Sequence, residues 1–291
     1  MTNECRACQG TTREFARDQV LGHVPALYLR CDVCGAVQAA DPTWLEEAYS
    51  DAIAKLDIGL LDRCQILASI TATVLRSERL RGGTFLDWAG GYGTLTRLMR
   101  DRGFDFAHTD PFATNIFAEG HESSPVTDAA GPGGQRYDLV TAFEVLEHLE
   151  DPVSALAPLS QRTDLLLTTT QVLPDPAPGP REWDYYTLET GQHITFYTRA
   201  SLEHLARRLG FDGVVTSNLV HLFHRGKVSA ATRALVRRPG VAYGLGHLAA
   251  LPDRRHSLMM RDYQRVSTSL SSPSEPSRGS VPDPARGTPD T

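Results

Sequence analysis

Residues 84–110 read TFLDWAGGYGTLTRLMRDRGFDFAHTD, and this stretch decides the fold. A short apolar run, Phe85 and Leu86, leads into Asp87, and glycines follow before a helical pattern. Glycine lets the backbone approach a ligand closely at a strand-to-helix turn. A second short strand ends at Asp110, which follows Asp87 by 23 residues, where a nucleotide-binding βαβ unit carries its ribose-binding acid. The stretch predicts a strand, turn, helix and strand that hold a nucleotide-like cofactor.

The spacing of the glycines narrows the kind of cofactor. A dinucleotide fold requires Gly-x-Gly-x-x-Gly, but the sequence from Gly91 reads Gly-Tyr-Gly-Thr-Leu-Thr, with Thr96 at the third glycine. A phosphate-binding P-loop requires Gly-Lys-Ser/Thr, and no such triplet follows. The stretch resembles instead the Asp/Glu-x-Gly-x-Gly-x-Gly loop of class I S-adenosylmethionine-dependent methyltransferases, with matches at Asp87, Gly91 and Gly93.

This resemblance implies S-adenosylmethionine as the cofactor. Ala89 departs from the pattern at its first glycine, and we expect the neighbouring Gly90 to take up the backbone torsion needed there. We expect the carboxylate of Asp110 to accept hydrogen bonds from the ribose hydroxyls. A structural glycine turn in another α/β domain is the alternative for the loop alone. The expected cofactor contacts are Asp87, Ala89, Gly90, Gly91, Gly93, Asp110 and Glu144.

The next part of the chain resembles the same family. Residues 137–143 predict a buried parallel strand, and the following run Glu-Val-Leu-Glu-His-Leu-Glu-Asp-Pro, residues 144–152, matches a long segment of these methyltransferases. Pro152 fits the first turn of a helix capped by Asp151. We expect Glu144 at the mouth of the active site because it lies just beyond the carboxyl end of a strand. His148 is either an acid or base or, as we favour, a loop-supporting hydrogen-bond partner.

Short apolar runs that alternate with helical patterns predict an α/β fold, a Rossmann-like doubly wound sheet. Residues 164–170 predict its fifth strand, residues 201–209 a helix, and residues 211–216 a late strand. The family resemblance implies seven strands in this sheet.

Four of the five cysteines form two pairs, Cys5-x-x-Cys8 and Cys31-x-x-Cys34, with 22 residues between the pairs. This spacing fits a zinc ribbon in which four thiolates hold a structural Zn²⁺. Two disulfides are the alternative. Because the first residues are polar and charged and resemble no signal peptide, we expect a reducing, cytoplasmic location, which favours zinc.

A zinc ribbon before such a core resembles a narrower group, the sugar-modifying methyltransferases. These include C-methyltransferases of nucleotide-linked deoxysugars and related enzymes of polysaccharide and natural-product biosynthesis. Their Glu-His element corresponds here to Gln192-His193, so the resemblance implies His193 as a general base, with Glu144 and Tyr186 as assistants. Glutamine in place of glutamate cannot accept a proton. O- or N-methylation is therefore the alternative to the C-methylation that the resemblance implies. His193 has the alternative role of orienting its loop.

The proline- and aromatic-rich segment 171–192 is expected to cover the methyl end of the cofactor and to shape the acceptor pocket.

Composition restricts the partners. The chain has 291 residues, 41% of them hydrophobic, and a net charge of −6, which argues against a nucleic-acid partner. No apolar run approaches the length of a membrane span. We therefore expect a small-molecule acceptor, with nucleotide-linked sugars among the candidates, no membrane partner, and a monomer or homodimer. The competing hypotheses are methylation of RNA or protein, with the ribbon as recognition module, and a non-catalytic partner subunit.

The predicted organisation has four parts. Residues 1–40 form the zinc ribbon, residues 41–83 form connecting helices, and residues 84–265 form the methyltransferase domain. Within this domain, residues 84–217 carry the sheet, residues 229–251 an accessory helical segment, and residues 257–260 a last strand. Residues 266–291 are rich in serine and proline and are expected to be disordered.

Overall fold

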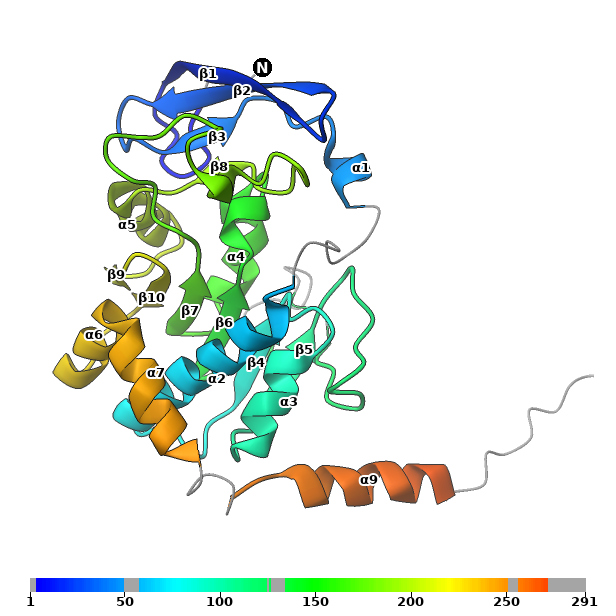
Figure 1. Ribbon diagram of the computed structural model, residues 1–291. Coiled ribbons are helices and arrows are strands. Elements are labelled where there is room, and N and C mark those ends of the chain that lie inside the picture. Colours follow the sequence, from blue (N-terminus) through cyan, green and yellow to red (C-terminus); the bar gives the residue numbers. More distant parts are fainter. Residues whose placement is uncertain (1–3, 50–57, 125, 127–133, 251–255, 272–291) are drawn as a thin grey trace, which may run out of the picture. The chain divides into compact units, whose positions relative to one another are not determined.

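The computed structural model describes residues 4–49, 58–124, 126, 134–250 and 256–271 (Figure 1). The chain divides into two compact units, the first ending at Leu258 and the second beginning at Met259. We had placed the end of the methyltransferase domain at residue 265. The boundary between the two units lies before that residue.

The first unit contains a six-stranded sheet in the order β5-β4-β6-β7-β10-β9. Strands β5, β4, β6 and β7 are parallel, whereas β10 is antiparallel to both β7 and β9. The central strands are short apolar runs that are buried on both faces, as expected for a covered parallel sheet. The bounds are β4 Phe85–Trp88, β5 Phe106–Thr109, β6 Leu139–Phe143, β7 Leu165–Thr169, β9 Gly213–Thr216 and β10 Val220–His224.

The prediction of seven strands in this sheet is wrong for the part of the chain that the structure describes. Beyond β5, the only pairing among the described residues is a single parallel bridge between His108 and Glu122. One bridge is too short to form a strand, so the sheet ends at β5. The sheet also extends to residue 224, past our boundary at 217, because β10 inserts between β7 and β9.

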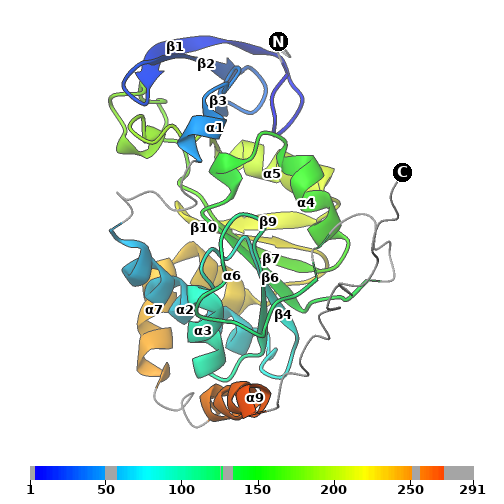
Figure 2. The ribbon, with the colours of Figure 1, turned by 90° about the vertical axis from the view of Figure 1, so that its right-hand side faces the viewer.

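Helices cover both faces of the sheet, which confirms the doubly wound arrangement (Figure 2). One hydrophobic cluster joins the sheet to α4 and α5, and the other joins it to α2, α3, α6 and α7. Asp151 caps α4 as predicted, because its carboxylate accepts the N–H groups of Val153 and Ser154 while Pro152 occupies the first turn. The bounds are α2 Leu60–Ser77, α3 Thr94–Asp101, α4 Pro152–Ser160, α5 Arg199–Arg208, α6 Ala230–Arg237 and α7 Pro239–Leu248.

The predicted accessory segment 229–251 is helical over α6 and α7, and residue 251 lies outside the described residues. Both helices pack on α2. The Thr73 hydroxyl donates to the Ala242 carbonyl at 2.9 Å, and a side chain larger than hydrogen at Gly246 would overlap the Ser69 backbone. The segment therefore completes one face of the core.

The cysteine-containing region forms a second, four-stranded sheet in the order β1-β2-β3-β8. Its bounds are β1 Thr12–Val20, β2 Val24–Cys31, β3 Val37–Ala39 and β8 Thr195–Phe196, and its pairings are antiparallel. The edge strand of this sheet, β8, comes from far along the chain. Residues 1–40 therefore do not form the module by themselves. Short helices α1 (Leu45–Ala48), η2 (Leu146–His148) and η3 (Asp184–Tyr186) complete the first unit.

The described part of the second unit is α9, Met259–Ser271, which corrects two predictions. Residues 259 and 260 are helical, not part of a last strand, and residues 266–271 are helical, not disordered. No proline or glycine interrupts the run before Pro273, so nothing in the sequence ends the helix earlier. Residues 272–291 lie outside the described residues.

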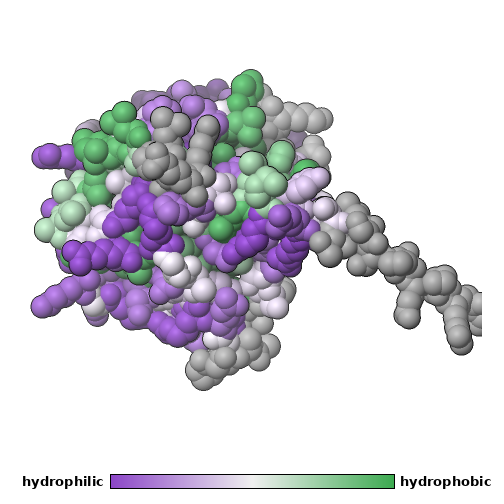
Figure 3. Space-filling model, turned by 90° about the horizontal axis from the view of Figure 1, so that it is seen from below, coloured by the Kyte–Doolittle hydropathy of each residue, from purple (hydrophilic) through white to green (hydrophobic). Residues whose placement is uncertain are grey.

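Exposed apolar side chains occur in several groups. In the view of Figure 3, hydrophobic areas are separated by hydrophilic ones. Exposed large apolar residues include Phe112 after β5 and Leu248 at the end of α7. Within the described ranges, no helix combines the length and the apolar character that a membrane crossing requires.

Candidate functional site

The predicted glycine loop joins β4 to α3 and has a left-handed backbone at three positions. These are Ala89 (φ 55°), Gly91 (φ 58°) and Gly93 (φ 81°). Our expectation that Gly90 would take up the torsion at the departure from the family pattern is therefore wrong, since Ala89 adopts the left-handed conformation itself. The N–H of Ala89 is held by the Thr109 carbonyl at 2.8 Å, which fixes the loop to the end of β5.

Gly90 is needed for a different reason, its contact with Asp87. A Cβ atom at residue 90 would overlap the Asp87 carboxylate. That carboxylate is 2% exposed and accepts hydrogen bonds from the hydroxyls of Thr141 at 2.8 Å and Thr96 at 3.1 Å. Burial raises the pKa of Asp87 to about 7, although both hydroxyls act in the opposite direction. Asp87 thus supports the loop from beneath and ties β4, α3 and β6 together.

Asp110 meets the loop, as the nucleotide-type arrangement requires. Its Oδ2 accepts the N–H of Gly91 at 2.8 Å, and its Oδ1 accepts the N–H groups of Phe112 and Ala113, both at 2.8 Å. A carboxylate has about four lone-pair sites, so Asp110 keeps capacity for a further donor. His108 adds a contact that the sequence analysis missed, since its Nε2 lies 2.9 Å from the Gly91 carbonyl oxygen. Burial lowers the pKa of His108, which favours the neutral ring.

Glu144 lies immediately after β6, next to the strand that carries the loop. It has a left-handed backbone (φ 53°), which turns its side chain at the strand end. Thr169, at the end of β7, holds it twice, because its hydroxyl donates to Glu144 Oε1 at 2.7 Å and accepts the Glu144 N–H at 2.8 Å. Arg63 Nε of α2 lies 3.9 Å from Glu144 Oε2. The structure therefore places Glu144 at the carboxyl edge of the sheet, as predicted.

A second polar cluster follows Glu144 and includes the predicted base. Ligand atoms of Glu147, His148 and His193 lie within 4.8 Å of one another. Tyr185 adjoins the cluster, because its ring centroid is 4.5 Å from that of His193 and its hydroxyl donates to Glu147 Oε1. Burial, followed by the nearby charge of Glu144, raises the pKa of Glu147 to about 8.

Backbone carbonyls fix both imidazoles of this cluster. His193 Nδ1 lies 2.7 Å from the Tyr185 carbonyl oxygen, and His148 Nδ1 lies 3.0 Å from that of Gln192. Because a carbonyl only accepts, each Nδ1 carries the proton and each Nε2 keeps a lone pair. The Tyr49 hydroxyl also lies 2.9 Å from His148 Nδ1, so the Nδ1–H of His148 has two acceptors. Burial lowers the pKa of His148 to about 4 and that of His193 to about 3. His148 supports the segment before His193, the role that we favoured for it.

Tyr186 does not join this cluster, which corrects its predicted role as an assistant. Its side chain is fully buried in the core of the cysteine-containing module, edge-on to Tyr28 with ring centroids 5.2 Å apart. Its hydroxyl donates to the Pro178 carbonyl at 3.2 Å. Tyr185, its neighbour, points toward the cluster instead. The aromatic residues of segment 171–192 thus pack in the core beneath the second sheet, together with Phe196 of β8.

The four paired cysteines converge as the spacing predicts. Cys5 Sγ lies 3.6 Å from Cys34 Sγ, Cys8 Sγ lies 3.4 Å from Cys31 Sγ, and all four sulfur atoms lie within 4.8 Å of one another. Sulfur atoms bound tetrahedrally to zinc at ~2.3 Å are separated by roughly 3.8 Å, so the donor set fits this ion.

Backbone N–H groups also point at the sulfur atoms. Gly10 donates to Cys8 Sγ, while Val33 and Cys34 donate to Cys31 Sγ, each at 3.4 Å. Such donors stabilise thiolates, the form in which cysteine binds a metal.

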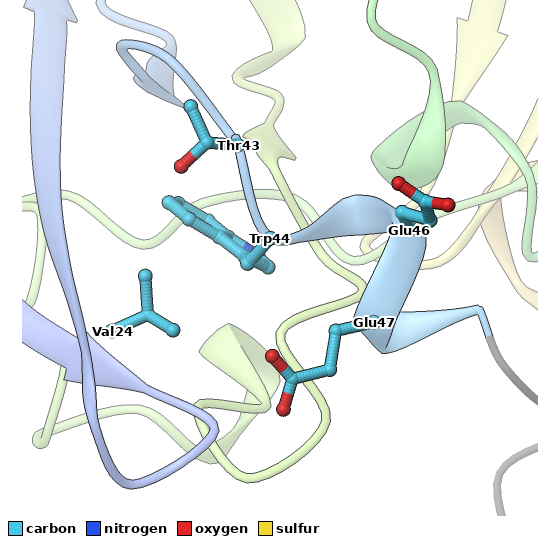
Figure 4. Close-up of a pocket in the computed structure, with 5 residues that line it drawn as sticks. All are labelled: Val24, Thr43, Trp44, Glu46 and Glu47. Atoms are coloured by element: carbon cyan, nitrogen blue, oxygen red, sulfur yellow. The ribbon is translucent and has the colours of Figure 1, made fainter.

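Two hollows lie away from the glycine loop, and the larger one adjoins Cys31 and Cys34 of the thiol cluster. A cavity of about 460 Å³ is lined by Val24 of β2 and by four residues of segment 43–47 (Figure 4). A larger hollow of about 920 Å³ is lined mainly by residues 30–35, 171–175 and 198–200. Neither includes the glycine loop or the histidine cluster.

The chain was compared with known proteins. A family model described as "Methyltransferase domain" matches residues 62–216. A search of curated protein sequences gave no match.

The chain is similar to three solved structures. CalO1, a methyltransferase in calicheamicin biosynthesis in an SAH-bound form, has 18% identity and a TM-score of 0.40, over 61% of this chain and 59% of CalO1. Magnesium protoporphyrin IX methyltransferase from Synechocystis PCC 6803 has 17% identity and a TM-score of 0.39, over 62% of this chain and 89% of that one. Human N-acetylserotonin methyltransferase has 15% identity and a TM-score of 0.40, over 63% of this chain and 66% of that one.

Proposed function

The chain belongs to the methyltransferase domain family, and from this premise we propose that it transfers a methyl group from S-adenosylmethionine to a small-molecule acceptor. The observation that carries the proposal is the bond between Gly91 N–H and the Asp110 carboxylate. It joins a left-handed glycine loop to an acid at the end of the adjacent parallel strand, the combination that a ribose-bearing cofactor requires.

Each part of this arrangement has a role in binding. The half-buried backbone at Ala89 and Gly91 contacts the amino-acid and ribose portions of the cofactor, and Asp110 accepts a ribose hydroxyl at its remaining lone pair. Glu144, one strand further along the sheet, faces the same edge. S-Adenosylmethionine, when bound, supplies an electrophilic methyl group on a sulfonium. The residues of the chain bind and orient it for in-line displacement, so most of the rate enhancement comes from positioning.

For the acceptor, we propose a sugar or natural-product intermediate, with nucleotide-linked sugars first among the candidates. This rests on the paired cysteines and on the resemblance of residues 189–198 to the sugar-modifying enzymes. His193 is the candidate base, since its Nδ1–H is held by Tyr185 and its Nε2 lone pair is free to accept. Gln192 is turned away, because its amide donates to the Ala48 carbonyl at 2.9 Å. Oxygen is therefore favoured over carbon as the acceptor atom.

We also propose that the four cysteines bind a structural Zn²⁺. Four thiolates fill a tetrahedral site and leave no position for water, so this ion would stabilise the fold and would not take part in the reaction. It would hold the two cysteine-bearing turns beside β8, where the Thr198 hydroxyl donates to the Cys34 carbonyl at 2.6 Å.

Calorimetric titration with S-adenosylmethionine and its demethylated product tests the cofactor assignment. We expect binding by the wild-type protein and at least tenfold weaker binding by Asp110→Asn, which removes the negative charge and one of the two acceptor oxygens. Glu122→Gln, at an exposed residue that forms an isolated bridge with His108 of β5, serves as a control. No binding of either compound by the wild-type protein would refute the proposal.

A second experiment identifies the acceptor. Purified protein is incubated with S-adenosylmethionine and a panel of nucleotide-linked sugars, and products are analysed for the added mass of one methylene group. Methylated RNA or protein, with no methylated sugar or other small molecule, would contradict the acceptor class.

A further inference from the structure

The cluster of Glu147, His148 and His193 has the composition of a metal site that is separate from the four cysteines. One ligand atom from each residue lies within 4.8 Å of the other two. The three residues come from two separate segments, η2 after β6 and the loop before β8, which meet at the carboxyl edge of the sheet. The main-chain bond from Ile194 N–H to the Glu147 carbonyl, at 2.8 Å, holds these segments together.

The carboxylate of Glu147 supplies an independent observation. The residue is fully buried, and its Oε1 accepts the hydroxyl of Tyr185. Its other oxygen, Oε2, is buried and has no hydrogen-bond partner in the described structure. A buried carboxylate oxygen without a partner is costly and calls for an explanation, such as a bound ion.

The two imidazoles are arranged as metal ligands usually are. A ligating histidine donates its second ring N–H to a carbonyl or carboxylate, which fixes the ring and directs the other nitrogen at the ion. His193 donates Nδ1–H to the Tyr185 carbonyl at 2.7 Å. His148 shares its Nδ1–H between the Gln192 carbonyl at 3.0 Å and the Tyr49 hydroxyl at 2.9 Å. Their ring centroids are 4.8 Å apart. Each ring is therefore held with Nε2 as its lone-pair atom.

We propose that Glu147, His148 and His193 bind one divalent transition-metal ion. Two imidazoles and one carboxylate suit Zn²⁺, Fe²⁺, Co²⁺ or Mn²⁺ better than the harder Mg²⁺ or Ca²⁺. Ligand atoms around such an ion are separated by roughly 3–3.5 Å, so binding draws the three groups together by about 1–2 Å. The negative charge of Glu144 lies close enough to act on Glu147, so it adds to the attraction of the site for a cation. The positive charge of Arg63, beside Glu144, partly offsets this attraction.

Three protein ligands leave coordination positions open, unlike the closed four-thiolate site. An open position takes an oxygen or nitrogen atom of a ligand at the edge of the sheet. With the ion bound, the Nε2 lone pair of His193 is a metal ligand and no longer acts as the general base. If the open position takes the methyl acceptor, the ion lowers the pKa of the acceptor hydroxyl in its place. Only this last step rests on the proposed function.

Manganese binding tests the site without cofactor or acceptor, so its result is independent of methyl transfer. The full-length protein is loaded with one equivalent of Zn²⁺ per chain, so that the four-thiolate site is filled and the second site is left open. It is then titrated with Mn²⁺, which disfavours thiolates, and free Mn²⁺ is measured by electron paramagnetic resonance. We expect one Mn²⁺ per chain, and at least tenfold weaker binding for Glu147→Gln, His148→Gln and His193→Gln.

The matched control is His224→Gln. His224 is also buried and also lies beside a backbone carbonyl, 3.0 Å from Gly226 O, but it is not part of a ligand cluster among the described residues. Its variant should bind Mn²⁺ as the wild type does. Equal binding by wild type and all three cluster variants would overturn the proposal.

A second measurement needs no variant, and so does not depend on how the variants fold. Co²⁺ added to the wild-type protein that holds one equivalent of Zn²⁺ per chain should give ligand-field absorption without a sulfur-to-metal charge-transfer band. A charge-transfer band, or no absorption at all, would overturn the assignment to nitrogen and oxygen ligands.

Discussion

Asp87 makes the stability of this protein depend on pH in an unusual direction. Its pKa is raised from 3.8 to about 7 by burial. Between these values the unfolded chain has lost the proton and the folded chain still holds it, so the unfolded state binds fewer protons. The free energy of unfolding therefore falls as the pH rises from about 4 to about 7. The total loss is about 4 kcal/mol, from about three pKa units at ~1.4 kcal/mol each.

The substitution Asp87→Asn removes this dependence while keeping the shape of the side chain. Between pH 5 and pH 8, the wild-type protein should lose roughly 2.5 kcal/mol more stability than the variant. The assay is urea unfolding followed by circular dichroism at several pH values, with the difference between the two proteins as the readout. This difference cancels the contributions of all groups that do not interact with residue 87.

Thr141→Val tests the opposite change, an increase in the pH dependence of stability. The Thr141 hydroxyl donates to Asp87 Oδ1 at 2.8 Å and lowers its pKa, so its removal should raise the pKa further and steepen the loss of stability. Parallel stability curves for wild type and Asp87→Asn would refute the reasoning, because they would show that the buried carboxyl titrates alike in both states.

Three further predictions follow from backbone geometry and from the thiol cluster. Ala89→Gly should stabilise the protein by up to about 1 kcal/mol because residue 89 has φ 55°, whereas Ala107→Gly in β5 should destabilise it by about 0.5–1 kcal/mol in the same urea experiment. Gly191→Ala should lower the free energy of unfolding by roughly 2–3 kcal/mol, and Gly22→Ala by only about 1 kcal/mol. Both residues have positive φ, but a Cβ at residue 191 would lie 2.9 Å from the Trp44 ring, whereas nothing lies within 4 Å at residue 22. Metal removal by a chelator should lower the melting temperature and change the near-ultraviolet dichroism of the second sheet, and an unchanged melting curve would argue against a structural ion.

The local parts of the fold were predictable from the sequence. The strand, turn and helix around residues 85–101 and the acid at Asp110 followed from apolar runs and glycine spacing, which report neighbours along the chain. The left-handed torsion at Ala89 and the role of Gly90 were not predictable. The torsion at Ala89 depends on a hydrogen bond to Thr109, which belongs to another strand. The role of Gly90 depends on its tertiary contact with Asp87.

The candidate site was likewise predictable only where local sequence patterns report it. Glu144 was expected at the carboxyl edge of the sheet because strand ends locate that edge, whereas His193 was implied by the family resemblance of residues 189–198. Tyr185 and Tyr186 are adjacent and chemically alike, and the packing of the second sheet decides which one faces the cluster. Glu147 carried no signal of its own inside a family-like run. Only its burial and its unpartnered oxygen mark it out.

The late arrival of β8 has a consequence for synthesis on the ribosome. The sheet that carries the four cysteines pairs Val37 and Gln38 of β3 with Phe196 and Thr195. At ~5–20 residues per second, the ribosome adds the residues between these strands in roughly 10–30 s. During that time the edge of β3 is open and the thiols are not enclosed. The N-terminal module, although made first, can reach its final structure only after most of the catalytic sheet has emerged.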